Sequence, residues 1–193
     1  MTFEIFLVFL LSYTLGSIPF GLILTKFFLN KDIRKVGSKN IGATNVLRTG
    51  NKFIAGLTLF LDISKGIVPI LITNYYFPNL IYLSGLMTFL GHIFPVWLKF
   101  KGGKGVATYL GIAFALSLKL GLFFCVSWIL IVFITKYSSL SSIISALIIF
   151  LISFLENNFE LNSFLFIGFV IILYTHRQNI VRLKNKTEDK IKL

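Results

Sequence analysis

A short run of lysines and glycines, residues 99–105, is the part of the sequence best suited to binding an anion. It consists of Lys99, Lys101 and Lys104 around Gly102, Gly103 and Gly105. Glycine lets the backbone adopt positive φ, so that several N–H groups can point at one spot, and the lysines add positive charge. The run lies between two apolar segments, so it predicts a phosphate site at the rim of a membrane. Such a site suits a reaction between a water-soluble phosphate compound and a lipid.

A second polar segment, VGSKNIGATNVLR at 36–48, joins two other apolar segments. Hydroxyl and N–H groups donate hydrogen bonds to an oxyanion, and the planar guanidinium of Arg48 can bind one with two parallel bonds. A plain cytoplasmic connector could have the same composition, but loops often carry function. The candidate binding residues are Gly37, Ser38, Asn40, Gly42, Thr44, Asn45 and Arg48.

A third polar segment, HRQNIVRLKNKTED, begins at His176 after the last apolar run. His176 and Asn179 are three residues apart and would share a face if the helix continues. Arg182 would lie one turn further on. The other basic residues here are expected to anchor the tail at the membrane: Arg177, Lys184, Lys186, Lys190 and Lys192.

The second and third apolar runs contain the ionisable residues Asp62, Lys65 and His92. Asp62 and Lys65 have i, i+3 spacing and predict an intramembrane ion pair with a structural role, although charges within a membrane are often functional. His92 follows Gly91 at the end of the third run. Its position leaves open whether it takes part in chemistry or braces the loop that follows.

Several familiar sites are excluded by the sequence. The glycine-lysine run is not a nucleotide-binding P-loop, because that pattern needs Ser or Thr after its lysine and Lys104 is followed by Gly105. One cysteine and two histidines cannot form a structural zinc site. We therefore expect no metal site.

Composition places the chain in a membrane. Of 193 residues, 56% are hydrophobic and 13% charged, whereas a soluble domain has about 25% charged residues. Apolar runs cover nearly the whole length, which predicts one integral membrane domain over 1–193 without a separate soluble part. The net charge of +12 fits membrane orientation and anionic substrates better than nucleic acid.

Seven apolar segments are visible, and the sequence favours seven crossings. A crossing needs about 20 residues, and the last four segments are short. Residues 105–135 could instead form one long helix interrupted by Ser117 and Lys119, which would leave six crossings. The segments are 3–29, 53–77, 80–98, 105–118, 120–135, 140–155 and 161–176.

Charge decides between the two counts. With seven crossings and the N-terminus outside, Lys119 is the only basic residue outside, together with Glu4, Glu156 and Glu160. With six, the Lys136 loop and the basic tail would also lie outside. Because cytoplasmic loops carry the excess of Lys and Arg, the sequence predicts an all-α bundle of seven transmembrane helices with a cytoplasmic C-terminus.

The seven-helix topology also predicts where a site would form. It places the 30–52 loop, the 99–105 loop, the Ser138–Ser142 turn and the tail from His176 on the cytoplasmic face. One site could then draw on all four, with Ser142 as a further candidate substrate-binding residue.

These loops together resemble the bacterial membrane glycerol-3-phosphate acyltransferases that use acyl phosphate as the donor. The resemblance runs over essentially the whole chain, and the block that contains the glycine-lysine run is highly specific by itself. It implies seven transmembrane helices in the cytoplasmic (inner) membrane. It also implies transfer of an acyl group to the sn-1 hydroxyl of glycerol 3-phosphate, giving lysophosphatidate and phosphate. The blocks that carry it are GSKNIGATNVLR at 37–48, LDISKG at 61–66, GHIFPVWLKFKGGKGVAT at 91–108 and HRQNIVRL at 176–183.

The resemblance also implies roles for particular residues. Ser38 and Arg48 match the serine and arginine of the family's first motif. Gly102, Gly103, Lys104 and Gly105 match the second motif, which is tied to glycerol-3-phosphate binding. His176, Asn179 and Glu188 match the third. One departure concerns the turn before Glu188, because Lys186 stands where the family usually has glycine.

The implied reaction agrees with the residues. An acyl phosphate is an activated mixed anhydride, so the enzyme must mainly position two phosphates and stabilise charge. Neither a cofactor nor a covalent nucleophile is needed. The proton of the attacking hydroxyl could go to His176 or to a substrate phosphate; the absence of a carboxylate placed to orient His176 favours the substrate. The alternative function is a transporter of organic phosphates, but the internal repeat typical of transporters is not visible.

Overall fold

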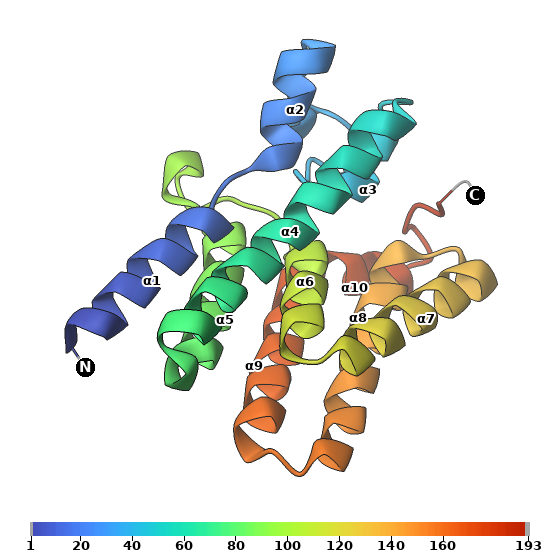
Figure 1. Ribbon diagram of the computed structural model, residues 1–193. Helices are drawn as coiled ribbons and strands as arrows, with labels where there is room; N and C mark the ends of the chain where they lie inside the picture. The colour runs from blue at the N-terminus through green and yellow to red at the C-terminus, as the bar shows by residue number, and fades with distance from the viewer. Residues whose placement is uncertain (1, 192–193) are drawn as a thin grey trace. The chain divides into compact units, whose positions relative to one another are not determined.

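The computed structural model describes residues 2–191, which are helical apart from their connecting segments and contain no strand. The chain forms two compact units that divide between Leu116 and Ser117, and each is described here by itself (Figure 1). Lys192, which the sequence assigns to the basic tail, lies outside the described residues. The prediction of a single domain over 1–193 stays a prediction.

The first unit is built around one long central helix, α4 (Lys52–Tyr76). Its start is capped by Asn51, whose side chain accepts a hydrogen bond from the Ile54 N–H at 3.0 Å. The other helices are α1 (Thr2–Gly16), α2 (Phe20–Leu29), α3 (Ala43–Leu47), α5 (Ile81–Ile93) and α6 (Val106–Leu116), and α4 packs against each of them. Three short 3-10 helices complete the unit: η1 (Ile33–Lys35), η2 (Pro78–Leu80) and η3 (Val96–Leu98).

The first apolar segment is divided into two helices by a break at Ser17–Pro19. A break inside a membrane leaves backbone carbonyls without helical partners, and these need other donors. Two side chains supply them. The Lys65 Nζ donates to the Ile18 carbonyl at 2.7 Å, and the Trp97 Nε1 donates to the Ser17 carbonyl at 3.0 Å.

The second unit contains α7 (Leu118–Thr135), α8 (Ser138–Ser153), the 3-10 helix η4 (Phe154–Glu156), α9 (Phe159–Thr175) and α10 (Arg177–Lys184). Helix α8 packs against both α7 and α9, and α10 contacts α8 and α9. The chain bends by 59° between α9 and α10, at His176. The tail then returns to the α7–α8 turn, where the Ile191 N–H donates to the Lys136 carbonyl at 2.8 Å.

Within residues 2–191, five helical segments have the length and composition of a membrane span, or six if the bent α9–α10 pair is one span. Helix α6, with 11 residues, is apolar but shorter. Ser117 is extended and separates α6 from α7, so residues 105–135 form two helices and not one long helix. The seven crossings and the outside N-terminus stay predictions.

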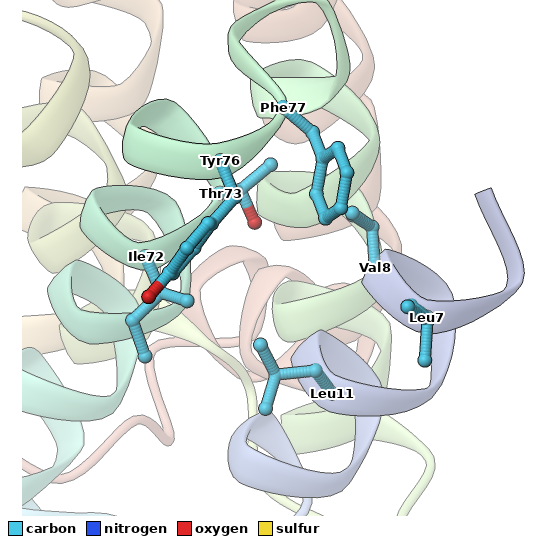
Figure 2. Close-up of a pocket in the computed structure, with 7 residues that line it drawn as sticks. All are labelled: Leu7, Val8, Leu11, Ile72, Thr73, Tyr76 and Phe77. Atoms are coloured by element: carbon cyan, nitrogen blue, oxygen red, sulfur yellow. The ribbon is translucent and has the colours of Figure 1, made fainter. Parts of the chain in front are cut away.

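An apolar groove of roughly 220 Å³ lies between α1 and the end of α4 (Figure 2). Ile72, where its α4 wall begins, is 20 residues from Lys52, which corresponds to about 30 Å along the helix. The groove is therefore remote from the 36–48 loop at the other end of α4. Its lining residues are Leu7, Val8, Leu11, Ile72, Thr73, Tyr76 and Phe77.

Candidate active site

The 36–48 loop is organised by one buried side chain, that of Asn45. Its Oδ1 accepts a hydrogen bond from the Ser38 N–H at 2.9 Å. Its Nδ2 lies 3.2, 2.9 and 2.7 Å from the carbonyl oxygens of Ile33, Val36 and Asn40. Asn45 is only 2% exposed. One amide thus fixes the path of the backbone on both sides of Ser38.

Buried apolar residues anchor the same loop to the neighbouring helices. Ile33, Ile41 and Val46 are buried in a cluster whose other members come from α2 and from the start of α4: Leu22, Leu24, Ile54 and Ala55. The polar residues between these anchors are therefore held at the surface of a packed structure. The sequence composition alone did not reveal this support, because the anchors are spaced irregularly.

Ser38 and Arg48 are exposed, and both lie close to Gly37: Ser38 follows it in the chain, and the Arg48 side chain approaches it. Gly37 has φ +50°, and a Cβ there would come within 2.6 Å of the Asn45 Oδ1 and 3.0 Å of the Arg48 Cδ. Glycine is required here both by the left-handed backbone and by this close approach. The loop thus brings the Arg48 side chain close to the residue before Ser38, and a hydroxyl and a guanidinium are groups that can bind an oxyanion.

The structure gives Asn45 a different role from the substrate contact that the sequence predicted. Its amide is used up by backbone groups, so we assign it to positioning Ser38. Asn40 and Gly42 also support each other, since the Asn40 Oδ1 accepts from the Gly42 N–H at 3.2 Å. Thr44 is half-buried on α3 and stays a candidate contact.

The glycine-lysine loop differs from the sequence interpretation in where its N–H groups point. The Gly102 N–H donates to the Ile93 carbonyl at 2.9 Å, and the Gly103 N–H donates to the His92 carbonyl at 3.1 Å. These two N–H groups therefore satisfy carbonyls at the end of α5. The sequence interpretation did not foresee these bonds, because nothing in the sequence showed that α5 would end against the loop; a contact between this loop and phosphate stays a prediction.

Packing explains two of the glycines in this loop. A Cβ on Gly103 would lie 2.1 Å from the His92 Nε2, and one on Gly105 would lie 2.1 Å from the Phe89 ring. Gly105 also has φ +85°. Lys104, between them, is half-buried and comes two residues before α6 begins at Val106. The tight backbone therefore fixes where the Lys104 side chain starts.

The predicted ion pair inside the membrane segment is confirmed. The Lys65 Nζ lies 2.8 Å from the Asp62 Oδ1, and the two side chains are only 3% and 4% exposed. The same Nζ is 5.6 Å from the centre of the Phe20 ring. Because Lys65 also bonds to the Ile18 carbonyl, the pair ties α4 to the break between α1 and α2.

In the second unit, His176 caps the end of α9 and is 2% exposed. Its Nδ1 is 2.9 Å from the Ile172 carbonyl oxygen. A carbonyl can only accept, so in the neutral ring Nδ1 carries the hydrogen and Nε2 carries the lone pair. A backbone carbonyl thus orients the imidazole, which is the role that the sequence analysis sought in a carboxylate.

Asn179 on α10 is held by Glu188. The Glu188 Oε1 accepts from the Asn179 Nδ2 at 2.6 Å and from the Ser139 Oγ at 2.7 Å, and its Oε2 accepts from the Arg182 Nε at 2.7 Å. Burial disfavours the charged carboxyl, but these donated bonds outweigh it and lower the pKa of Glu188. Glu188 therefore joins α8, α10 and the tail.

The turn before Glu188 forms although Lys186 stands where the family usually has glycine. Lys186 adopts φ +57°, a left-handed conformation that glycine adopts without strain. Lys186 therefore holds a backbone conformation that is also open to glycine. In this turn Glu188 reaches Asn179.

Ser142 does not have the exposed hydroxyl that a substrate contact would need. It is 3% exposed, donates to the Ser138 carbonyl at 2.8 Å and accepts from the Trp128 Nε1 at 3.1 Å. The structure instead assigns it to the packing of α7 against α8. Residues 2–191 contain no cluster of three or more His, Cys, Asp or Glu side chains that could hold a metal ion.

Comparison with known proteins identifies the family. The model of the glycerol-3-phosphate acyltransferase family matches residues 6–186. A glycerol-3-phosphate acyltransferase of Pelagibacter ubique is 54% identical over 98% of this chain and 99% of its own length. One from Mesorhizobium japonicum is 46% identical, covering 99% of this chain and 98% of its own.

Solved structures agree. The glycerol 3-phosphate form of PlsY, an integral membrane glycerol 3-phosphate acyltransferase, superposes with a TM-score of 0.93 at 38% identity, over 97% of this chain and 96% of that one. The lysophosphatidic acid form gives a TM-score of 0.90 at 37% identity, over 97% and 95%. This chain therefore belongs to the glycerol-3-phosphate acyltransferase family of integral membrane enzymes.

Proposed function

We propose that this protein transfers an acyl group from acyl phosphate to the sn-1 hydroxyl of glycerol 3-phosphate, releasing lysophosphatidate and inorganic phosphate. The observation that carries the proposal is the loop in which the buried Asn45 fixes the backbone at Ser38, while the exposed Arg48 side chain approaches Gly37, the residue before Ser38. A hydroxyl and a guanidinium fixed in this way suit a phosphate monoester. The relatives that bind glycerol 3-phosphate and lysophosphatidic acid support the same substrate and product.

The reaction needs positioning more than it needs a special group. The sn-1 oxygen attacks the acyl carbonyl carbon, the bond from that carbon to the phosphate oxygen breaks, and phosphate leaves with the bonding electrons. Ser38, Arg48 and Lys104 stabilise the negative charge on the substrates, which lowers the barrier when the donors are already in place. The acyl chain lies among the apolar helices, in contact with membrane lipid.

We assign the hydroxyl proton to the Nε2 of His176, because the Ile172 carbonyl holds the ring in the tautomer that leaves Nε2 as the acceptor. Asn179, which is fixed by Glu188, lies three residues further along the chain and is the second candidate substrate contact of this unit. A cytoplasmic location for the site follows from the positive-inside rule. Family membership supports an enzyme over the alternative, a transporter of organic phosphates.

A donor comparison tests the proposal. Purified protein in detergent receives glycerol 3-phosphate with acyl phosphate, acyl-CoA or acyl carrier protein in separate reactions. Of the three donors, we expect only acyl phosphate to give lysophosphatidate, together with an equal amount of inorganic phosphate. Equal turnover with acyl-CoA, or lysophosphatidate without phosphate release, would show that the donor assignment is wrong.

A further inference from the structure

The imidazole of His92 lies between the buried ion pair and the glycine-lysine loop. Its Nδ1 is 3.9 Å from the Asp62 Oδ1, and its Nε2 is the atom that a Cβ on Gly103 would strike at 2.1 Å. One edge of the ring therefore faces α4 and the other faces the loop. His92 is 4% exposed, so solvent does not occupy either side.

The α4 side of the ring is held firmly. Asp62 pairs with Lys65, and Lys65 in turn donates to the Ile18 carbonyl at the α1–α2 break. Desolvating two charges is costly, so a buried pair is weak evidence for a contribution to stability alone, and charges inside a membrane are retained chiefly for function. Here the pair is fixed in place and borders the histidine.

The loop side of the ring is equally constrained. The Gly103 N–H donates to the carbonyl of His92, while the side chain of the same residue packs against the Gly103 Cα. His92 thus contacts Gly103 through both its backbone and its ring. Lys104 is the next residue, and its backbone position follows directly from that of Gly103.

We propose that His92 is a positioning residue, supported by Asp62 and Lys65, which acts through Gly103 to set the place of the Lys104 ammonium. This inference rests on the proposed function, because it takes Lys104 to bind the phosphate of glycerol 3-phosphate. A contact with that phosphate exists before and during acyl transfer. Misplacing Lys104 therefore raises the KM for glycerol 3-phosphate more than it lowers kcat.

Two amide variants of His92 separate ring position from chemistry. In His92→Gln, an amide reaches the place of the Nε2 edge; in His92→Asn, the amide reaches only the place of the Nδ1 edge. We expect His92→Gln to keep a KM for glycerol 3-phosphate close to wild type. His92→Asn leaves the loop unsupported and should raise this KM by about tenfold, with a smaller change in kcat.

A double-mutant cycle tests the contact with Gly103. Gly103→Ala should raise the KM for glycerol 3-phosphate by about tenfold alone, because its methyl group meets the ring. In the His92→Asn background the space under Gly103 is vacant, so adding Gly103→Ala should raise KM by much less than it does in the wild type. Gly56→Ala is the matched control, since no atom lies within 4 Å of a Cβ there.

Thermal unfolding in detergent is measured for every variant. The proposal would be overturned if the KM of the double variant rose by the product of the fold-changes in His92→Asn and Gly103→Ala. An unchanged KM in His92→Asn would also overturn it. Equal losses in the Gln and Asn variants, matched by lower unfolding temperatures, would show a purely structural role and would also overturn it. The cycle uses whichever acyl donor the wild-type protein accepts, so a failed acyl-phosphate assignment is detected separately in the wild type.

Discussion

Ser38 and Arg48 are exposed, whereas Asn45, which positions Ser38, is buried. All three are polar residues of one loop, and the sequence analysis grouped them together as binding residues. Burial separates their roles, because a side chain whose hydrogen bonds go to its own backbone has few left for a ligand. Ser38, Arg48 and the half-buried Lys104 are therefore the strongest candidates for substrate contact in the first unit.

Alanine substitutions test this division. Ser38→Ala, Arg48→Ala and Lys104→Ala should each lower acyl transfer by at least about tenfold, because losing a hydrogen bond to a charged group costs about 1.5–3 kcal/mol. Lys190→Ala should keep near-wild-type activity, because Lys190 lies on the tail. Its Nζ is 5.7 Å from the centre of the Tyr137 ring there. Steady-state turnover in detergent measures all four.

Lys192→Ala, outside the described residues, is also expected to stay near wild type. The contradicting result would be that the tail lysine variants lose as much acyl-transfer activity as the Ser38, Arg48 and Lys104 variants. That outcome would mean that the basic residues act through membrane attachment and that the site assignment is wrong. Amounts of inserted protein are compared first, so that a failure to accumulate is not read as a loss of activity.

At the scale of elements, the 36–48 segment behaves as a folded unit and not as a flexible connector. Its two sources of order are the Asn45 amide and the buried anchors Ile33, Ile41 and Val46. The same loop carries Ser38 and Arg48 at its surface. The acyl-transfer activity of the protein should therefore depend on the stability of this loop.

Asn45 variants test this link. Asn45→Ala removes every bond to the amide, and Asn45→Asp replaces the donor with an oxygen that faces three carbonyl oxygens. Both should lower the unfolding temperature in detergent as well as activity, with Asp at least as harmful as Ala. If Asn45 contacted substrate directly, activity would fall while the unfolding temperature stayed unchanged.

The tail of the second unit is a folded element as well. Glu188 receives bonds from α8 and α10, and Ile191 bonds to the α7–α8 turn. The sequence interpretation of a basic anchoring tail missed these contacts. Ser139, which donates to Glu188, lies 49 residues away along the chain, and no spacing rule indicated that they would meet.

Glu188 should make this tail sensitive to acid. Its pKa is lowered from the ordinary value of 4.5, so its contribution to stability is complete above about pH 4.5 and is lost as the pH falls through the lowered value. Glu188→Gln should reduce the unfolding temperature at neutral pH and flatten its dependence on pH in this acid range. Thermal unfolding in detergent from about pH 3 to about pH 7 gives the comparison. Parallel curves for the two proteins would contradict the role of Glu188.

At the scale of the whole molecule, the expected topology decides whether the polar loops meet at one membrane face. The described residues contain five or six segments of spanning length, and α6 is apolar but has 11 residues. Short helices can cross where the bilayer thins or where neighbours cover their ends. Labelling from outside the cell can count the crossings directly.

Single cysteines, introduced with Cys125→Ser as the background, provide this test. Cysteines near Asn79, Lys119 and Asn157 should react with an impermeant thiol reagent applied outside. Those near Lys52, Lys101, Ser138 and Lys186 should react only after the membrane is permeabilised. Labelling of the Lys186 site from outside would rule out seven crossings and, with them, a single cytoplasmic site.

The sequence by itself determined the membrane class, the apolar segments and the family, because hydropathy and short motifs are local properties of the chain. It also predicted the Asp62–Lys65 pair, since i, i+3 spacing brings two side chains together on any helix. Glycine, however, has more than one use. The sequence could not tell that the Gly102 and Gly103 N–H groups would bond to the end of α5.

Only the tertiary structure decided which polar residues are exposed and which are buried and bonded within the fold. Asn45 and Ser142 proved to be buried and bonded within the protein, while Ser38 and Arg48 are exposed. Lys186 adopts a left-handed conformation in the turn before Glu188, although it is not a glycine. The physical reason is common to these cases: burial and hydrogen-bond partners depend on residues distant in the chain, and composition and spacing carry no record of those contacts.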